Sequence, residues 1–195
     1  VIFLKKNKKK LILASSSKNR ILILKRMKVP FIAMSPKISE TPKVNEEPKL
    51  IAKRLSYEKA LSAKKKFRND YIIAADTIVY ARKKVINKTK LVDQAKLNLK
   101  TLSGRRHRVF TGVTILQGDS KYFQHVCTSI VKFRLLSDKD IDEYLSLNEW
   151  VNCAGSYSIQ GFAESFVEMI SGSYSNVVGL PIHVIYKILK NNNFL

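Results

Sequence analysis

The sequence predicts an α/β fold with a mixed β-sheet. Short apolar runs that are typical of strands alternate with helical stretches in the first half of the chain, and a block rich in strand-like segments follows in the middle. The chain has 195 residues, of which 45% are hydrophobic and 26% charged, enough for one globular domain with a substantial core. No linker or low-complexity segment divides it, so we expect a single domain over residues 1–195.

The first elements follow from short apolar runs and a proline-rich break. Residues 11–14 (LILA) predict a buried strand, and the serines that follow lead into an apolar-rich helix over residues 18–28. Residues 29–34 (VPFIAM) predict a second strand. Residues 35–48 contain three prolines and three glutamates, which indicates a surface loop.

The middle of the chain predicts two helices with a hairpin between them. We expect a helix over residues 50–67, then a strongly apolar strand over 71–80 with residues 83–86 pairing back on it. A second, amphipathic helix is expected over residues 90–102, and Ser103-Gly104 would end it as a glycine C-cap does.

The rest of the chain begins with two long strand-like segments, at residues 106–117 and 121–134. Gln117-Gly118-Asp119-Ser120 between them is a hairpin signal. Later elements are predicted by local signals: a capping box of Ser137 and Asp140 before a helix reaching Leu147, a strand-like FVEMI at residues 166–170, and Pro181 in the first turn of a closing helix to about Lys190.

The net charge of +21 predicts attraction to ligands that contain phosphate. The cationic residues are scattered, with short runs only at Lys8–Lys10 and Lys64–Lys66, so we do not expect nucleic acid as the main partner. No apolar run approaches the roughly 20 residues of a membrane helix, and residues 1–10 lack the apolar region of a secretory signal. Cys127 and Cys153 form no ligand pattern, so a reducing cytoplasm is the expected compartment.

Three serines stand between the first strand and the first helix. Amides at a helix N-terminus bind anions, serine hydroxyls add donors, and Arg20 in the first turn would offer a forked pair of donors to phosphate oxygens. Ser15 and Ser17 are therefore candidate phosphate ligands. The alternative is that one serine is only the N-cap of the helix.

Asp76 and Lys59 are charged residues in apolar surroundings. Asp76 interrupts an apolar strand, and a carboxylate buried there usually meets a metal, a cation or a hydrogen-bond cluster, each of which makes it useful for activating water. Lys59 falls on one helix face with Leu55 and Ala63, so we expect it to point inward. The alternatives are a structural aspartate at a strand end and a lysine that snorkels to the edge.

Gln160 is a candidate for contact with a nucleobase. It lies in AGSYSIQG, where we expect it between strand-like neighbours, although an amide suits a loop equally well. The chain has no GxxxxGK[ST] loop and no GxSxG elbow, which argues against a P-loop ATPase and an acyl-transfer serine. The remaining candidate ligands or nucleophiles are expected to be structural, on the surface or in the core: His107, His125, His183, Cys127 and Cys153.

Six segments together resemble the Maf family. They are Ser15–Arg20 after the first strand, Glu58-Lys59-Ala60, Ala75-Asp76-Thr77, Leu102–Val113, Ala154–Gly161 and Gly172–Pro181. They follow the expected order over about residues 11–189, and the later ones are long enough to be specific. On these motifs the chain is identified as a member of the Maf family.

The resemblance implies an elongated α/β fold, similar to inosine triphosphatase, with a cleft between two intimate lobes, and commonly a homodimer. It implies a pyrophosphatase that hydrolyses a nucleoside triphosphate to the monophosphate and pyrophosphate with Mg²⁺ or Mn²⁺. Asp76 falls on the family's general base and would share the metal with Glu40. The positions that the family uses for phosphate or metal are Ser15, Arg20, Glu40, Lys59 and Lys88.

Asn19, Thr77 and Gln160 are the candidates for nucleotide choice. The Ala-Asp-Thr and Ile-Gln-Gly sequences resemble the subgroup that acts on dTTP and UTP. Two departures from the family are Lys18-Asn19 in place of Pro-Arg and Asn87-Lys88-Thr89 without the usual proline, so we expect activity with an altered base preference. The alternative is a non-catalytic protein that binds nucleotide or nucleic acid in cell-division control.

Overall fold

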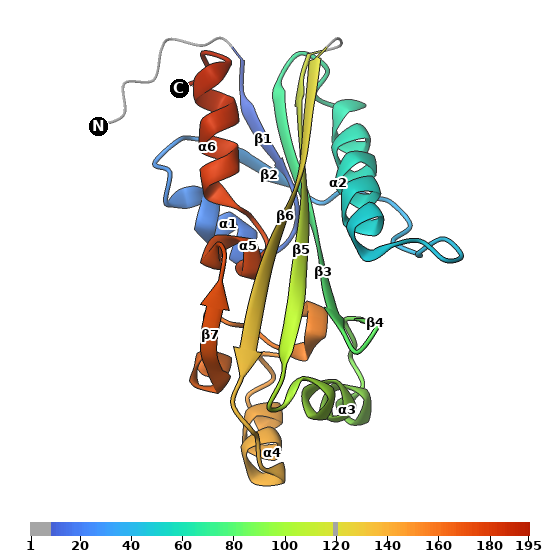
Figure 1. Ribbon diagram of the computed structural model, residues 1–195. Helices are drawn as coiled ribbons and strands as arrows, with labels where there is room; N and C mark the ends of the chain where they lie inside the picture. Colours follow the sequence, from blue (N-terminus) through green and yellow to red (C-terminus); the bar gives the residue numbers. More distant parts are fainter. Residues whose placement is uncertain (1–8, 119–120) are drawn as a thin grey trace. The chain divides into compact units, whose positions relative to one another are not determined.

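The computed structural model describes residues 9–118 and 121–195 and confirms the predicted α/β fold (Figure 1). Its mixed sheet has seven strands in the order β2-β1-β3-β5-β6-β7, with β4 paired to β3. The strands are β1 (Leu11–Ala14), β2 (Ile32–Met34), β3 (Tyr71–Ala81), β4 (Lys84–Ile86), β5 (Arg106–Gln117), β6 (Lys121–Phe133) and β7 (Val167–Ser171). The helices are α1 (Lys18–Lys25), α2 (Pro48–Lys64), α3 (Val92–Leu102), α4 (Asp138–Ser146), α5 (Tyr174–Val178) and α6 (Ile182–Asn191), with short 3-10 helices η1 (Ala154–Ser156) and η2 (Phe162–Phe166).

The strands and helices predicted from the sequence are all present, with shifts at their ends. Helix α1 ends three residues earlier than expected, because the chain turns after Lys25 and Lys28 takes a φ of +55°. Strand β2 begins only at Ile32. Pro181 is the N-cap residue of α6 rather than its first-turn residue.

Three short helical segments, α5, η1 and η2, are not predicted from the sequence. Each has at most five residues, too few for a helical period to be visible. Gly155 within η1 takes a φ of +73°, so this segment is a distorted turn rather than a regular helix. The hairpin tip at Asp119-Ser120 and most of residues 1–10, on which the secretory-signal argument rests, lie outside the described residues.

The described chain divides into two compact units. The first takes in the described residues up to Asp76, those of Thr111–Cys127, and Gly179–Leu195; the second consists of Thr77–Phe110 and Thr128–Val178. Strands β3, β5 and β6 each supply residues to both units. The single domain and the cleft between two lobes both stay predictions.

The first unit is built around parallel strand pairs. Strand β1 pairs in parallel with β2 and with β3, and all four of its residues are buried. Continuous apolar strands of this kind are typical of parallel sheets that are covered on both faces. In Figure 1, α2 and α6 lie on opposite sides of the strands of this unit.

Helix α2 packs closely against strand β5 at Gly112, where no side chain separates the two backbones. A Cβ atom built on Gly112 of β5 would lie 2.1 Å from the carbonyl oxygen of Ala52 in α2. Ala60 and Ala63 of α2 join the apolar core cluster that Ile72 of β3 belongs to. Small residues on both elements thus bring α2 close to the sheet.

The second unit has an aromatic core. Trp150, Tyr144, Phe133 and Phe166 are among the largest fully buried side chains. Phe166 makes edge-to-face contacts with Tyr144 and Phe133, at ring-centroid distances of 5.3 and 6.0 Å. The predicted capping box is present at the start of α4.

The three histidines have the structural and surface positions that we expected. His107 is buried in the second unit, where its Nε2 lies 2.9 Å from the hydroxyl of Tyr157, and burial lowers the pKa of this imidazole to about 4. His125 and His183 are exposed.

Both cysteines are free thiols. Cys127 is buried, as expected, but Cys153 is only half-buried because it lies in the turn before η1, so the prediction of a core thiol is wrong for Cys153. Burial raises the pKa of each thiol to about 11.

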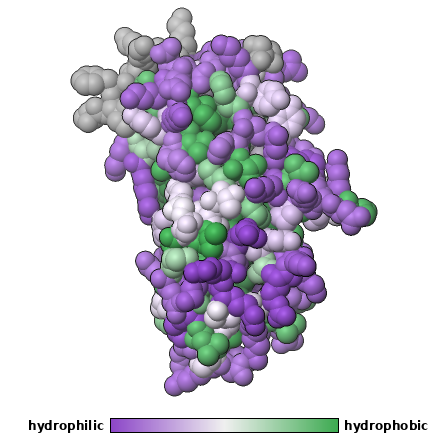
Figure 2. All heavy atoms as spheres, in the orientation of Figure 1, coloured by the Kyte–Doolittle hydropathy of each residue, from purple (hydrophilic) through white to green (hydrophobic). Residues whose placement is uncertain are grey.

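Most of the surface drawn in Figure 2 is hydrophilic, with apolar residues in smaller groups among the polar ones. This matches a chain with 36 Lys and Arg residues against 15 Asp and Glu. Among the described residues, no helix has the length and apolar character needed to cross a membrane.

Candidate functional site

Lys59 joins two carboxylates within the first unit. Its Nζ donates a hydrogen bond to Asp76 Oδ1 at 2.5 Å and lies 2.8 Å from Glu40 Oε1. Lys59 and Asp76 are only 5% and 6% exposed, and Glu40 is half-buried. The ammonium offsets negative charge that would be costly to bury unpaired. We call these three residues the Lys59 cluster.

The elements that present the Lys59 cluster are those that the sequence predicts. On α2, Leu55 and Ala63 are buried on the same face as Lys59, so the lysine points inward and does not snorkel to the edge. Asp76 lies within β3 and not at a strand end, so the strand-end alternative is wrong. Glu40 comes from the loop between β2 and α2.

The serines at the start of α1 bond to one another. Ser17 is the N-cap, and its hydroxyl accepts the backbone N–H of Arg20 at 3.4 Å. The backbone N–H of Ser17 donates to the hydroxyl of Ser15 at 3.1 Å, and Ser15 is buried. Ser17 is therefore the N-cap, and Ser15 bonds within the turn that leads into the helix, while a contact of either serine with phosphate stays a prediction. Asn19 is half-buried in the first turn of α1.

Arg20 of α1 bonds to the short segment between α5 and α6. Its Nε donates to the carbonyl oxygen of Gly179 at 2.8 Å. Burial lowers the pKa of Arg20, while the carboxylates of Asp76 and Glu40 act in the opposite direction. A guanidinium remains protonated at neutral pH, so Arg20 adds positive charge to the surroundings of the Lys59 cluster.

Thr77, Lys88 and Gln160 belong to the second unit. Thr77 is half-buried in β3, and Lys88 is exposed in the segment after β4. Gln160 lies in a turn between η1 and η2, where its Nε2 donates to the hydroxyl of Ser158 at 2.6 Å. The prediction of strand-like neighbours for Gln160 is wrong, because the chain there forms turns and 3-10 helices.

Asn98 of α3 links the segments that contain Lys88 and Gln160. Its Nδ2 donates to the carbonyl oxygen of Asn87 at 3.1 Å and to the hydroxyl of Ser156 at 2.8 Å. Asn98 was not among the residues predicted from the sequence. A polar residue on the buried face of an amphipathic helix was the signal available, because Asn98 lies beside the buried Leu99 and Leu102.

Asp76 and Glu40 fit a divalent cation that binds together with a phosphate. Both carboxylates already approach one positive charge, the ammonium of Lys59. Mg²⁺ is usually held by one or two carboxylates plus substrate phosphates and not by a complete protein cage. Within the described residues there is no group of three or more His, Cys, Asp and Glu side chains that would form such a cage.

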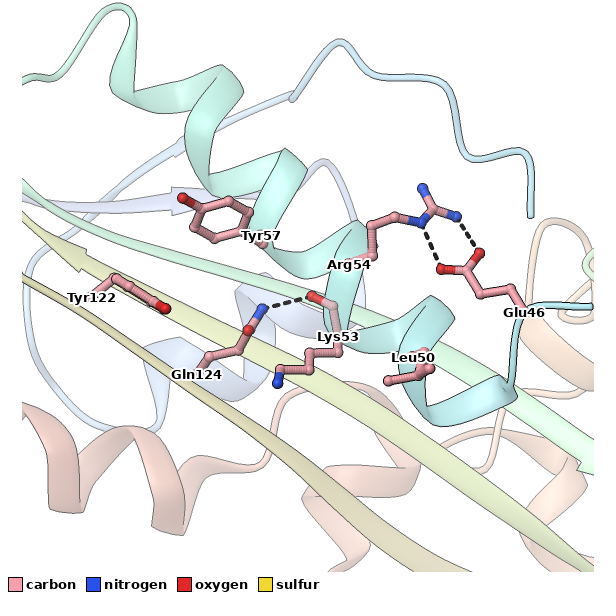
Figure 3. Close-up of a pocket in the computed structure, with 7 residues that line it drawn as sticks. All are labelled: Glu46, Leu50, Lys53, Arg54, Tyr57, Tyr122 and Gln124. Carbon is pink, nitrogen blue, oxygen red and sulfur yellow. Dashed lines mark hydrogen bonds and ion pairs between the residues drawn. The ribbon is translucent and has the colours of Figure 1, made fainter. Parts of the chain in front are cut away.

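A separate pocket of about 370 Å³ lies in the first unit (Figure 3). None of the predicted site residues lines it. Its walls come from α2, from β6 and from the loop before α2: Glu46, Leu50, Lys53, Arg54, Tyr57, Tyr122 and Gln124. The Gln124 Nε2 donates to the carbonyl oxygen of Lys53 and to Thr114 Oγ1, so this amide ties β6 to α2 and to β5.

Residues 10–192, nearly the whole chain, match the sequence model of a family described as Maf-like protein. The chain belongs to the Maf family. The six segments that indicated this membership from the sequence all lie within the matched residues.

Named relatives of this Maf-family chain are enzymes. A dTTP/UTP pyrophosphatase of Wolbachia sp. subsp. Drosophila simulans (strain wRi) is 48% identical to it over 101 residues, which cover 51% of this chain and 50% of that protein. A nucleoside triphosphate pyrophosphatase of Rickettsia rickettsii (strain Sheila Smith) is 47% identical over 93 residues, which cover 46% of this chain and 43% of that one. The Maf-family chain thus spans about half the length of the curated relatives it matches.

Among solved structures, this Maf-family chain is similar to the Staphylococcus aureus Ham1 protein. The two are 16% identical with a TM-score of 0.45, and the match covers 64% of this chain and 72% of the other. This likeness is too weak to inform the fold or the function.

Proposed function

We propose that this chain is a metal-dependent nucleoside triphosphate pyrophosphatase that hydrolyses dTTP or UTP to the monophosphate and pyrophosphate. The observation that supports it best is the Lys59 cluster, where a buried carboxylate, a second carboxylate and a buried ammonium converge in a Maf-family chain. The names of the relatives support the substrate class.

In the proposed reaction, Asp76 is the general base. It accepts a proton from a water molecule whose oxygen forms a bond to the α-phosphorus, while the bond from that phosphorus to the bridging oxygen breaks and pyrophosphate leaves. Arg20, Lys59 and Lys88 are proposed to offset the negative charge of the triphosphate, the effect that matters most in phosphoryl chemistry. Ser15 and Ser17 shape the turn at the N-terminus of α1, which favours anions.

Asp76 and Glu40 are proposed to hold Mg²⁺ or Mn²⁺. When bound, the ion would supply positive charge at the phosphates and favour ionisation of water. Lys59 already contacts both carboxylates, so it is placed to keep them oriented and to contact a phosphate oxygen when a triphosphate binds.

Base preference is proposed to depend on Asn19, Thr77 and Gln160. The amide of Gln160 has both a donor and an acceptor, which suits the edge of a pyrimidine base. In this structure its Nε2 donates one N–H to Ser158, so a base would be contacted through the second N–H of Nε2 or through Oε1.

The deciding experiment compares Asp76→Asn with Asp70→Asn as a matched control. Asp70 lies just before β3 and accepts the backbone N–H of Lys10, a bond that asparagine can also accept. We expect Asp76→Asn to lower kcat for pyrophosphate release from dTTP and UTP by roughly 10²–10⁴-fold and Asp70→Asn to leave it nearly unchanged. An Asp76→Asn protein that is folded and still turns over at the wild-type rate would exclude Asp76 as the base.

The same assay separates turnover from the binding-only alternative. Polyanion binding weakens steeply as salt rises, whereas turnover should depend mainly on the divalent metal. A folded wild-type protein that releases no pyrophosphate from any triphosphate, with Mg²⁺ or Mn²⁺, would favour the binding protein. We also propose that the protein is a homodimer, and its sedimentation coefficient at assay concentration tests this. The proposed source of the substrate is the cytoplasmic nucleotide pool.

A further inference from the structure

The loop that contains Glu40 has no regular secondary structure of its own. Residues 35–47 lie between β2 and α2, and Thr41–Asn45 are all exposed. Glu40 nevertheless reaches Lys59 at 2.8 Å. Side-chain bonds that attach this loop to α2 therefore contribute to the position of its carboxylate.

Arg54 of α2 supplies the main attachment. Its Nε and Nη2 donate to the two carboxylate oxygens of Glu46 at 2.7 and 2.6 Å, a forked pair that is visible in Figure 3. Nη2 also donates to the carbonyl oxygen of Thr41 at 3.2 Å. Thr41 is the residue after Glu40. One guanidinium therefore binds the loop at two places, at Thr41 beside Glu40 and at Glu46.

A second attachment lies on the other side of Glu40. The backbone N–H of Lys37 donates to the hydroxyl of Ser62 at 3.2 Å. Helix α2 therefore contacts the loop at three points along its length, through Arg54, Lys59 and Ser62. Since all three residues are on one rigid helix, the loop is fixed in the same frame as Lys59.

The forked pair is a strong one for its location. The side chains of Arg54 and Glu46 are 17% and 9% exposed, so water screens them only in part. The pKa of Glu46 is lowered to about 2, mainly by the hydrogen bonds from Arg54. This carboxylate therefore stays charged at the pH of any ordinary assay. Lysine is a point charge and cannot reproduce a fork that matches both oxygens.

We infer that Arg54 is a positioning residue for the proposed reaction: through Thr41 and Glu46 it holds the Glu40 carboxylate against Lys59. The inference rests on the proposed function, because its importance comes from Glu40 as a metal-holding group. Within the described residues, the hydrogen bonds of Arg54 go to Thr41, Glu46 and Glu58, and not to Asp76 or Lys59. Its role is to fix the loop, and the pocket in Figure 3 is the space beside this attachment.

The test uses the full chain with Arg54→Lys and Glu46→Gln, and Glu58→Gln as the matched control. Glu58 also pairs with Arg54, at 3.2 Å, but it lies on α2, so this pair joins Arg54 to its own helix and not to the loop. Two quantities are measured: the Mg²⁺ concentration that gives half-maximal dTTP hydrolysis, and amide hydrogen exchange in residues 37–47. The second needs no metal and no substrate.

We expect Arg54→Lys and Glu46→Gln to raise the half-saturating Mg²⁺ concentration about tenfold, as for other residues that orient a metal ligand. Exchange in residues 37–47 should become faster while the centre of α2 stays protected. Glu58→Gln should stay within about twofold of the wild type on both measures, since Glu58 is the more exposed partner of Arg54 and its bond lies within α2.

Unchanged Mg²⁺ dependence and unchanged exchange in Arg54→Lys would overturn the inference. An equal effect of Glu58→Gln would also overturn it, because charge on α2 and not the loop attachment would then be the cause. A wild-type protein without turnover is a different result: it refutes the proposed function, and the exchange data still show whether Arg54 fixes the loop.

Discussion

At the scale of single residues, the protein uses burial in two opposite ways. Lys59 and Asp76 are buried as a charged pair, and each charge compensates the other. His107 is buried without a charged partner, and its Nδ1 has no hydrogen-bond partner among the described residues. Its imidazole is therefore kept neutral, which burial favours by lowering its pKa to about 4.

The neutral His107 predicts a loss of stability in mild acid. The unfolded chain takes up a proton on this residue near pH 6.5, whereas the folded chain does so only near pH 4. The contribution of neutral His107 to the free energy of unfolding is thus complete above pH 6.5 and declines as the pH falls toward 4. Between pH 7 and pH 5 we expect a loss of about 2 kcal/mol in the free energy of unfolding, measured with urea, and a clearly smaller loss in His107→Phe. An equal loss in both proteins would show that another group is responsible.

At the scale of elements, helix α2 is the part on which the site depends most. It supplies Lys59 on one face and Arg54 on another, and its backbone lies directly on β5 at Gly112. Any shift of α2 therefore moves Lys59 and the loop attachment together.

Replacing Gly112 with alanine tests this dependence. The added Cβ would lie 2.1 Å from the carbonyl oxygen of Ala52, so α2 has to move. We expect a loss of about 3 kcal/mol in the free energy of unfolding, at the upper end of ordinary overpacking, together with lower pyrophosphatase activity in the protein that remains folded. Gly118→Ala is the comparison: its Cβ meets nothing within 4 Å, so only its positive φ opposes it, at about 1 kcal/mol. Equal stability of the two variants would mean that α2 can retreat from β5 freely.

The elements also show what the sequence could predict. The apolar run of β3 and the inward stripe of α2 are strong periodic signals, and they placed Asp76 and Lys59 correctly as buried groups. The turn around Gln160 was missed because its geometry depends on Gly155 with a positive φ and on 3-10 segments too short to have a period. Arg54 was missed because its partners are a loop carboxylate and a carbonyl oxygen, and no residue type in the sequence marks such a pair in advance.

At the scale of the whole molecule, the excess of positive charge is the dominant electrostatic property. Opposite charges do pair on the surface, for example Lys100 with Asp138 and Lys132 with Glu168, but exposed pairs of this kind contribute little. A net charge of +21 makes repulsion between unpaired cations the larger effect.

Added salt should therefore stabilise the protein. Between roughly 0.05 and 0.5 M NaCl, screening shortens the range of the repulsion more than it weakens the surface ion pairs. We expect the Tm to rise by about 3 °C, which corresponds to about 1 kcal/mol for a chain of this size. A falling Tm in a thermal scan over the same salt range would show that the ion pairs outweigh the repulsion.

The way the chain passes through its two units limits how the protein can be divided or varied. The first unit is assembled from three stretches of sequence and the second from two. A single break inside residues 77–178 therefore leaves no fragment that contains a whole unit. One crossover between related genes cannot exchange one unit and leave the other intact, so neither unit can be inherited as a separate module.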